Sequence, residues 1–364
     1  MTRTQETYRR LFRMAHNLGP NGQLPTFAEL RGDLGVSVAT LNRALELLET
    51  HRVVYRRHGV GIFVCSNLGQ RNIAVVCRPR FFEGPEISPF WQILIDHLRR
   101  VVTERQYGFS MHFGTADGAE FGLQEDLKRL VEERRVQGVV GLGLGREAGD
   151  WLRDAGVPAV GFAGEMPFRV VVDYPRIVRE GLDYLADRGC RRIAIVTPLE
   201  SFDRVQEFFD PDRIAAFRLR GVDVTVIDTA AAVGRSEGND RPYPLPLWEQ
   251  GYRVVQTIFG PKNGGNAPDG IVSTSELFSQ GMLIGLQRNG ITVGEQVHLV
   301  THANEGASVL LPWVGEIVRF LVSPAELAVT MLEMLETLFA GEVPEPATRI
   351  HVAERVPDGG AVRI

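Results

Sequence analysis

The sequence predicts an α/β protein in which a small N-terminal winged helix-turn-helix domain precedes a large domain built on parallel β-sheet. Residues 24–64 contain two short helix patterns separated by a glycine, followed by two alternating apolar runs around a glycine turn. From Asn72 onward, strand-like apolar runs alternate with helical patterns, which is typical of βαβ units whose sheet is covered on both faces. A chain of 364 residues with 44% hydrophobic residues can form two or three domains, each with its own core.

Capping residues mark the helix-turn-helix. Thr26 precedes Glu29 by three residues, so the pair can form a capping box at the start of a short helix. Gly35 ends that helix, and Ser37 caps the next one after the short break that a helix-turn-helix requires. Apolar residues recur along the second helix at helical spacing, so we expect one buried stripe and one outward face. The predicted stripe is Leu41, Ala44, Leu45 and Leu48, and the outward face carries Ala39, Asn42, Arg43 and Glu46.

A two-stranded wing follows the second helix. The periodicity changes to alternation after His51, with strands predicted on either side of the turn that contains Gly59 and Gly61. Arg56, Arg57 and His58 would lie near the tip of this wing. The candidate DNA-binding residues are therefore Thr26, Ser37, Ala39, Thr40, Asn42, Arg43, Arg56, Arg57, His58 and Gly59.

The charge distribution agrees with DNA binding by the first domain alone. Residues 1–66 hold nine arginines against five acidic residues, a net charge of +4. The remainder holds 31 basic against 40 acidic residues, a net charge of −9. A polyanion is therefore attracted to the first domain and repelled by the rest.

Several classes of site find no support in the sequence. The cysteines, at 65, 77 and 190, are odd in number and widely spaced, which argues against a disulfide framework and a zinc site. The eight histidines are scattered and form no HExxH or similar helix pattern, so we predict no metal, no cofactor and no catalytic residues. Residues 1–19 contain no apolar run, so we expect no signal peptide, no membrane span and a cytoplasmic location.

The N-terminal motifs resemble those of the GntR-type bacterial transcription regulators. The resemblance covers about the first sixty-five residues and rests on Leu24-Pro25-Thr26, Leu34-Gly35-Val36-Ser37, Thr40, Ala44-Leu45 and the Gly59/Gly61 wing. The chain departs from the family pattern at three positions that are usually basic, which are Ala28, Val38 and Asn42 here. Arg43 is expected to compensate, with Asn42 pairing to adenine and Arg43 to guanine in the major groove.

The large domain carries a second resemblance, across residues 72–356, to the effector domain of LacI-type repressors and to periplasmic sugar-binding proteins. Its main segments are Ser88-Pro89-Phe90, Val172-Asp173, the Gly189-Cys190-Arg191-Arg192-Ile193-Ala194 step, Arg213-Ile214-Ala215-Ala216-Phe217 and Pro324. The combination with a GntR-type head is similar to AraR-like hybrid transcription regulators. The resemblance implies two α/β subdomains joined by three crossovers, with a small ligand between them at the carboxyl ends of the strands. The expected domains are 1–66 for DNA binding, a polar linker at 67–71, and 72–364 for effector binding and dimerisation, with an irregular loop at 230–250.

The resemblance also assigns candidate effector-binding residues. Arg213 matches a ligand-binding arginine, Trp91 matches an aromatic that stacks on ligands, and Trp248 is a candidate for the opposite wall. Ordinary packing in the core or at a dimer interface remains open for both tryptophans. Ser88 replaces an asparagine of the family, and Ser275-Glu276 and Ala303-Asn304 replace its usual polar pairs. The candidate effector site is Ser88, Trp91, Arg213, Trp248, Ser275, Glu276 and Asn304.

Two alternatives stay open beside this interpretation. The loss of carboxylates at a sugar site would leave buried hydroxyls unpaired, which permits an unusual effector or a degenerate cleft without one. Gly143-Leu144-Gly145-Arg146-Glu147-Ala148 follows a predicted strand and fits the dinucleotide pattern G-x-G-x-x-A, with Glu165 about twenty residues later, which permits an NAD-binding oxidoreductase-like protein. That motif normally follows the first strand of its unit, and here at least two βα units precede it.

The sequence therefore predicts a ligand-responsive bacterial transcription regulator that is not an enzyme. We expect a homodimeric repressor that binds a pseudo-palindromic operator, with a sugar or related polar molecule in the cleft between subdomains changing its affinity for DNA. Double-stranded DNA, one small-molecule effector and a second copy of the chain are the expected partners.

Overall fold

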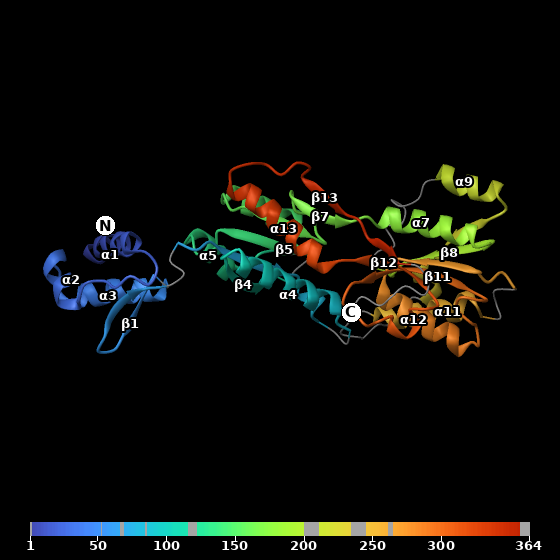
Figure 1. Ribbon diagram of the computed structural model, residues 1–364, viewed down its shortest axis with the longest axis horizontal. Coiled ribbons are helices and arrows are strands. Elements are labelled where there is room, and N and C mark those ends of the chain that lie inside the picture. Colours follow the sequence, from blue (N-terminus) through green and yellow to red (C-terminus); the bar gives the residue numbers. More distant parts are fainter. Residues whose placement is uncertain are drawn as a thin grey trace.

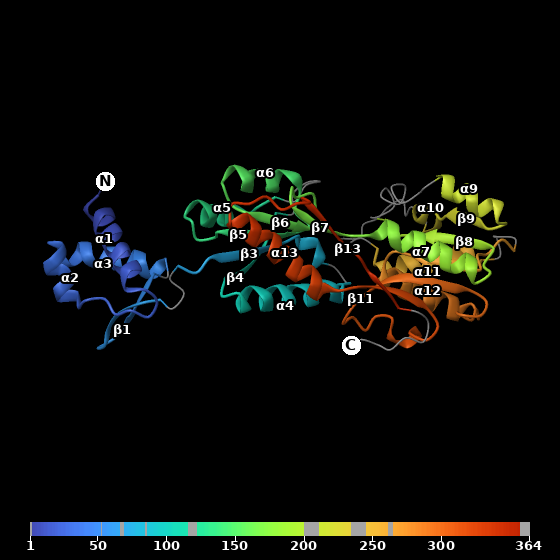
Figure 2. The same cartoon turned by 45° about the horizontal axis from the view of Figure 1, so that its top comes forward.

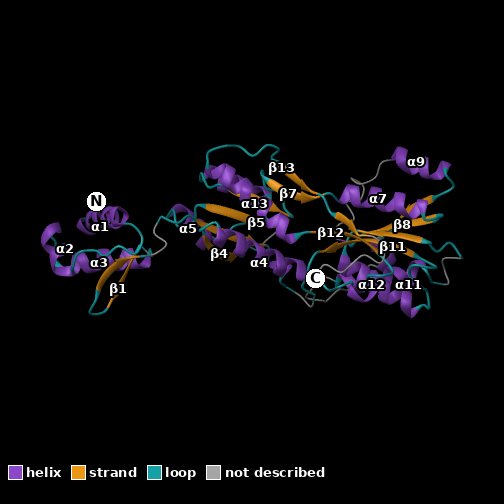
Figure 3. Ribbon diagram, in the orientation of Figure 1, coloured by secondary structure: helices purple, strands orange, loops and turns teal. Residues whose placement is uncertain are grey.

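The computed structural model describes residues 2–51, 53–65, 69–83, 86–115, 122–199, 211–233, 245–260 and 265–356. These residues form a head at the N-terminal end and two lobes, each built on its own six-stranded sheet (Figure 1). The head lies next to the first lobe and at the far end of the molecule from the second (Figure 1). Helices and strands alternate through both lobes, as the colouring in Figure 3 makes clear.

The head is a winged helix-turn-helix. Its elements are α1 (Arg3–Leu18), α2 (Phe27–Leu34), α3 (Val38–Thr50), β1 (Val54–Arg57) and β2 (Gly61–Val64). Thr26 and Glu29 form the predicted capping box, with the Glu29 carboxylate accepting from the Thr26 amide at 2.8 Å. Gly35 ends α2 in the left-handed conformation at φ 61°, and the Ser37 hydroxyl caps α3 by accepting from the Thr40 amide at 3.1 Å. All four residues of the predicted stripe on α3 are fully buried against α1 and the wing.

The polar segment after the head is anchored to the first lobe at its end. Residues 66–68 lie outside the described residues, so the predicted linker is seen only from Gly69. Gln70 donates to the Gln106 carbonyl, and the Arg71 guanidinium lies 4.5 Å from the centre of the Phe339 ring. The Arg71 carbonyl accepts from the Gly108 amide at 2.8 Å. The end of the segment is therefore part of the first lobe.

The first lobe is a parallel sheet with helices on both faces. Its strands are β3 (Asn72–Cys77), β4 (Gly108–Phe113), β5 (Gly138–Leu142), β6 (Ala159–Phe162), β7 (Arg169–Val172) and β13 (Thr348–His351), in the spatial order β13-β7-β6-β5-β3-β4. Its helices are the short η1 (Pro79–Phe81), α4 (Pro89–Glu104), α5 (Glu125–Glu132), α6 (Arg146–Asp154) and α13 (Pro324–Phe339). Alternate strand residues enter two separate cores, one under α4 and α13 and the other under α5 and α6. Figure 2 shows α4 and α6 on opposite sides of the sheet.

The second lobe repeats this architecture with one antiparallel edge. Its strands are β8 (Arg192–Val196), β9 (Asp223–Val226), β10 (Gly270–Ser273), β11 (His298–Asn304), β12 (Val318–Val322) and β14 (Glu354–Val356), in the order β14-β12-β11-β10-β8-β9. Only β14 runs antiparallel to its neighbour. The helices are α7 (Tyr174–Asp187), α9 (Pro211–Leu219), α10 (Thr229–Val233), α11 (Leu247–Ile258), α12 (Glu276–Arg288) and the short η5 (Leu311–Trp313). Helices α11 and α12 cover one face, and α7 covers the other.

Within the described residues the chain passes between the two sheets three times. It leaves the first sheet after β7 and enters α7, returns from β12 into α13, and leaves again between β13 and β14. Asp173 caps α7 and Ser323 caps α13, so two of the crossings coincide with helix N-termini. The carboxyl ends of the strands of both sheets consequently meet near these crossings.

The stretch 230–250, expected to be an irregular loop, is partly helical. Its beginning belongs to α10 and its end to α11, while residues 234–244 lie outside the described residues. The three prolines at 242, 244 and 246 led to the wrong boundary, because Pro246 is in fact the residue that precedes the first turn of α11. Among the residues that the structure describes, no helix has the length and apolar character that a membrane crossing requires.

Candidate functional site

The outward face of α3 is polar and open to solvent. Ala39 and Arg43 are exposed, and Asn42 is half-buried. The Arg43 side chain pairs with Glu46 at 3.2 Å, and 68% of the Arg43 side chain is exposed, so this pair is weak and easily exchanged for another partner. At the start of the helix, the Ser37 and Thr40 hydroxyl groups lie 2.8 Å apart. In helix-turn-helix motifs, the N-terminal residues of the second helix contact the base edges. The corresponding residues of α3 are exposed, as such a contact requires.

The wing is tied to α3 through Arg56. Its backbone amide and Nε donate to Glu49 Oε1 at 3.0 and 2.9 Å, and its Nη2 donates to Glu49 Oε2 at 2.5 Å. Nη1 also donates to Asn42 Oδ1 at 3.5 Å. The hydrogen bond to Glu49 raises the pKa of Arg56 further. Arg56 thus connects the wing to α3. The sequence had placed Arg56 nearer the tip of the wing.

The remaining candidate DNA-binding residues of the wing are better placed than Arg56 to contact the phosphate backbone of DNA. Arg57 pairs with Gly61 at the last rung of the hairpin, and His58 and Gly59 form the turn, with Gly59 at φ 71°. Arg57 and His58 are exposed and make no ion pair with the residues that the structure describes. Two free cationic or polar side chains at the tip of a hairpin suit contact with DNA.

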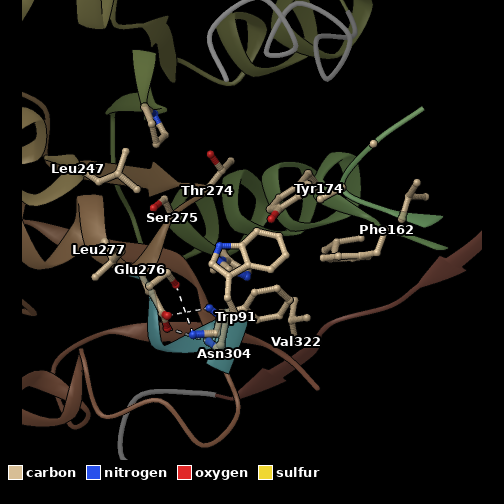
Figure 4. A pocket seen from close by; sticks show the side chains of 18 of the residues that line it. Trp91, Phe162, Tyr174, Leu247, Thr274, Ser275, Glu276, Leu277, Asn304 and Val322 are labelled. Atoms are coloured by element: carbon tan, nitrogen blue, oxygen red, sulfur yellow. Dashed lines mark hydrogen bonds between the residues drawn. The ribbon is translucent and has the colours of Figure 1, made fainter. Parts of the chain in front are cut away.

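A cavity of about 690 Å³ lies between the two lobes. Most of its lining comes from the carboxyl ends of strands in both sheets and from the segments that follow them, where α/β proteins generally bind ligands. Its size is that of a small-molecule site. Five of the seven predicted effector residues line it: Ser88, Trp91, Ser275, Glu276 and Asn304. Figure 4 shows four of them around the cavity, with Trp91 projecting into its centre.

Aromatic side chains of the first lobe form one wall. Trp91 stacks on Phe81 with ring centres 3.7 Å apart and planes 10° apart, and the rest of its surface lines the cavity. Phe162 lies at the end of β6 with its ring centre 6.2 Å from that of Trp91. Ser88 caps α4, and its hydroxyl accepts from the Phe90 amide at 3.3 Å. An aromatic face held rigidly in this way is suited to stack on a sugar ring or another flat apolar surface.

On the second lobe, Glu276 and Asn304 satisfy each other. Glu276 Oε2 accepts from the Asn304 amide at 2.9 Å and Oε1 accepts from Asn304 Nδ2 at 2.7 Å (Figure 4). Only 3% of Glu276 is exposed, and this burial raises the pKa of its carboxyl above the usual value, against the lowering effect of the Asn304 hydrogen bonds. The Asn304 side chain also forms a hydrogen bond with His302 of the same strand.

His302 is a lining residue that sequence reasoning missed. Strand alternation places it on the same side of β11 as Asn304, while Ala303 between them enters the core under α11 and α12. His302 is 7% exposed, and burial lowers the pKa of its imidazole to about 4. Its ring lies 5.6 Å from that of Tyr174, and its Nδ1 is buried without a hydrogen-bond partner among the described residues. The alternation with Asn304 is the signal that could have found it.

Charged residues gather at the first-lobe end of the cavity. Arg146 at the start of α6 lies 3.6 Å from Glu165, and both side chains are more than half exposed. Arg169, the first residue of β7, also lines the cavity. None of the three was predicted as an effector residue. No group of three or more potential metal ligands occurs in the described part of the chain.

Two predicted effector residues do not line the cavity. Arg213 lies on α9 and forms an ion pair with Asp183 of α7, so the role assigned to it by resemblance is not supported by its position. Trp248 lies in the first turn of α11 with 43% of its surface exposed, and its amide donates to Glu86 Oε1 at 3.3 Å. Its neighbour Leu247 lines the cavity instead. The residue of α11 that lines the cavity is therefore one position before the predicted Trp248, and one position along a helix turns the side chain by about 100°.

The dinucleotide-like motif is explained by packing. Gly143 has φ 79°, and a Cβ there would lie 2.7 Å from the ring of Phe81, the same ring that supports Trp91. A Cβ on Gly164 would lie 2.2 Å from the Leu144 carbonyl oxygen. Glu165, expected to bind a ribose in the dinucleotide interpretation, pairs with Arg146. Gly143, the first glycine of the motif, is therefore required by its close packing against Phe81.

Comparison with protein-family models gives two matches. Residues 4–64 match the model described as bacterial regulatory proteins of the gntR family, and residues 182–360 match that of the periplasmic binding protein-like domain. The first match covers the whole head, and the second covers the second lobe, the return crossing and α13. None of the curated proteins searched matches the chain significantly.

Solved structures share the fold of the chain. The transcription regulator CcpA of Lactococcus lactis is 15% identical with a TM-score of 0.57, over 80% of this chain and 99% of that one. The transcriptional regulator CelR in complex with cellobiose is 18% identical with a TM-score of 0.57, over 90% and 92% of the two chains. The Lac repressor bound to ONPG is 14% identical with a TM-score of 0.58, also over 90% and 92%. The chain thus combines a GntR-type helix-turn-helix domain with a periplasmic-binding-protein-like domain.

Proposed function

We propose that the chain is a cytoplasmic, ligand-responsive repressor that binds a pseudo-palindromic operator as a homodimer. A sugar or related polar small molecule in the cavity between the lobes would lower its affinity for the operator. The observation that carries this proposal is the presence, in one chain, of an exposed reading helix and a cavity of small-molecule size at the carboxyl ends of the strands.

The two functions are linked by the lobes. The cavity is lined by both lobes, so a ligand that contacts both favours one relative arrangement of them. The head continues directly into the first lobe through Arg71. In a dimer joined through its lobes, such a rearrangement changes the separation of the two heads, and their half-sites lie about one helical turn, roughly 10 bp, or a multiple apart. Coupling of this kind requires that the ligand bind the two arrangements with different affinities.

The proposal is tested first on DNA. The purified full-length protein selects its site from a random double-stranded library, and fluorescence anisotropy measures binding to the enriched sequence in a fixed salt concentration. We expect enrichment of an inverted repeat and a mass of two chains per operator. Failure to enrich any sequence would exclude a sequence-specific regulator.

Ligand response is tested on the same protein. A thermal-shift screen covers sugars, sugar acids, polyols, sugar phosphates and NAD, because a ligand at a hundred times its dissociation constant adds about 2.7 kcal/mol of native stability. A compound that stabilises the protein should then release it from the selected operator. DNA binding without any ligand response supports the degenerate cleft, which the mutual pairing of Glu276 and Asn304 favours. Stabilisation by NAD alone supports the dinucleotide interpretation.

A further inference from the structure

One of the basic residues that line the cavity has no acidic partner among the residues that the structure describes. Four lining residues carry a formal charge at neutral pH, namely Arg146, Glu165, Arg169 and Glu276. Arg146 and Glu165 form a pair at 3.6 Å whose side chains are 70% and 56% exposed, so they neutralise each other at the rim. Glu276 is buried, and both of its carboxylate oxygens accept hydrogen bonds from Asn304. Arg169 forms no ion pair with the described residues, whereas Arg146 is paired with Glu165.

Arg169 is held in place by its strand and has no counter-ion in the part of the chain that the structure describes. Strand alternation directs Val170 and Val172 into the core under α4 and α13. Arg169 and Val171 face the other way, and both line the cavity. Arg169 pairs in register with Gly161 and Thr348, so the backbone beneath its side chain is fixed by strands on both sides.

The opposite side of the cavity offers a different chemistry. His302 is 93% buried there, and its Nδ1 has no partner among the described residues. Asn304 lies beside it and also lines the cavity, with its side chain hydrogen-bonded to Glu276 and to His302. Groups of this kind pair with ligand hydroxyls, and a ligand that leaves them unpaired loses affinity. Trp91 supplies an aromatic surface for the same ligand.

We infer that the effector is a polyhydroxy compound that carries a carboxylate or phosphate group, and that Arg169 binds this group. This inference rests on the proposed function, because it concerns the ligand of the same cavity. The planar guanidinium of arginine matches both anions, and a charge-assisted bidentate pair gives direction as well as attraction. The hydroxyl groups of the ligand lie toward His302 and Asn304, and the anion lies toward β7. A neutral sugar would leave Arg169 desolvated without a partner.

Isothermal titration calorimetry with matched compounds tests the inference on the full-length protein. Each set holds a neutral sugar, its uronic acid and its 6-phosphate: glucose, glucuronate and glucose 6-phosphate, and the corresponding galactose set. We expect an acidic member to bind at least tenfold more tightly than its neutral parent, and the comparison of uronic acid with phosphate distinguishes the two anions. Arg169→Gln should weaken the binding of that acidic compound about ten- to a hundredfold. Arg169→Lys should weaken its binding less, because lysine keeps the positive charge but lacks the two parallel N–H donors of the guanidinium.

Arg146→Gln is the matched control, since Arg146 lines the same cavity but already has Glu165 as a partner. We expect it to change the affinity for the acid less than Arg169→Gln does, and all three variants should bind the operator like the parent. Tighter binding of the neutral sugars, or acid binding that Arg169→Gln leaves unchanged, would overturn the inference while leaving the proposed function intact. Operator binding without a response to any compound of either set would overturn the inference together with the ligand-responsive part of the proposal.

Discussion

His302 makes the stability of the protein depend on pH in a defined direction. In the native protein burial holds its pKa at about 4, below the ordinary value of 6.5. In the unfolded chain the imidazole is solvated and returns to that ordinary value. Between pH 6.5 and pH 4, the imidazole is therefore protonated in the unfolded chain but neutral in the native protein. The stabilisation is complete above pH 6.5 and is lost as the pH falls toward 4.

The size of the effect follows from the two pKa values. A shift from 6.5 to about 4 corresponds to about 3 kcal/mol when the loss is complete. At pH 5 the same relation gives a loss of about 2 kcal/mol relative to pH 7.5. For a domain of the size of the two lobes, this corresponds to a lowering of Tm by about 3 °C. The imidazole is 93% buried, so little of this effect is screened by solvent.

The assay compares the parent with His302→Gln, which cannot take up a proton. Tm is measured by circular dichroism between pH 7.5 and pH 5 at constant ionic strength. The substitution removes a buried ring and should destabilise the protein by a constant amount at all pH values. The difference between the two proteins should then shrink by about 2 kcal/mol on acidification. The subtraction removes the contributions of other titrating groups.

Glu276 needs a separate control because it shares Asn304 with His302. Its raised pKa has the opposite effect: it stabilises the native protein at low pH, and this contribution is lost as the pH rises through the raised value. The same comparison is therefore repeated in a Glu276→Gln background. If the parent and His302→Gln lose stability in parallel in both backgrounds, the imidazole is not buried in its neutral form and the reasoning fails.

Three further predictions concern the head and the thiols. Arg43→Ala should cost about 1–3 kcal/mol on the selected operator and relax the preference at one base pair, as measured by anisotropy on single-base variants; an equal loss on all sequences would assign Arg43 to phosphate contacts instead. Glu49→Ala should leave α3 folded but release Arg56, so that operator affinity falls while the helix content measured by circular dichroism is unchanged. An affinity equal to that of the parent would show that the wing does not contribute to operator binding. Cys77 and Cys190, whose pKa values burial raises to about 12 and about 11, should resist a thiol reagent at pH 8 until the protein is unfolded, and rapid labelling of either in the native protein would contradict their burial.

The head could be predicted from the sequence almost residue by residue. Its boundaries depend on local rules, such as the capping pair Thr26 and Glu29 and the left-handed Gly35, which act within a few residues of the chain. Its buried stripe follows from helical periodicity alone. Arg56 is the exception, because its attachment to Glu49 depends on how far the hairpin folds back over α3.

The cavity could be predicted in place but only partly in composition. Ser275, Glu276 and Asn304 were assigned by the resemblance, as replacements for polar pairs of the family, and all three line the cavity at the carboxyl ends of strands. Arg213, which the resemblance also assigned to the effector site, pairs with Asp183 and does not line the cavity, because a resemblance gives the position of a residue in the sequence and not the partner of its side chain. Arg169 was missed because it begins a strand, and the stagger between β6 and β7 that brings it level with Gly161 is a tertiary feature.

Helix α13 has a mechanical consequence. It begins at the return crossing, next to Val322 of the cavity wall, and ends at Phe339, on which the Arg71 guanidinium rests just after the head. Its 16 residues form a rod about 24 Å long. Near its far end, Glu336 is clamped by Arg105 at 2.6 Å. A helix that is held at both ends moves as one body along its axis. A shift of the crossing therefore either moves the segment from Gly69 to Arg71, which follows the head, or breaks the contact between Arg71 and Phe339.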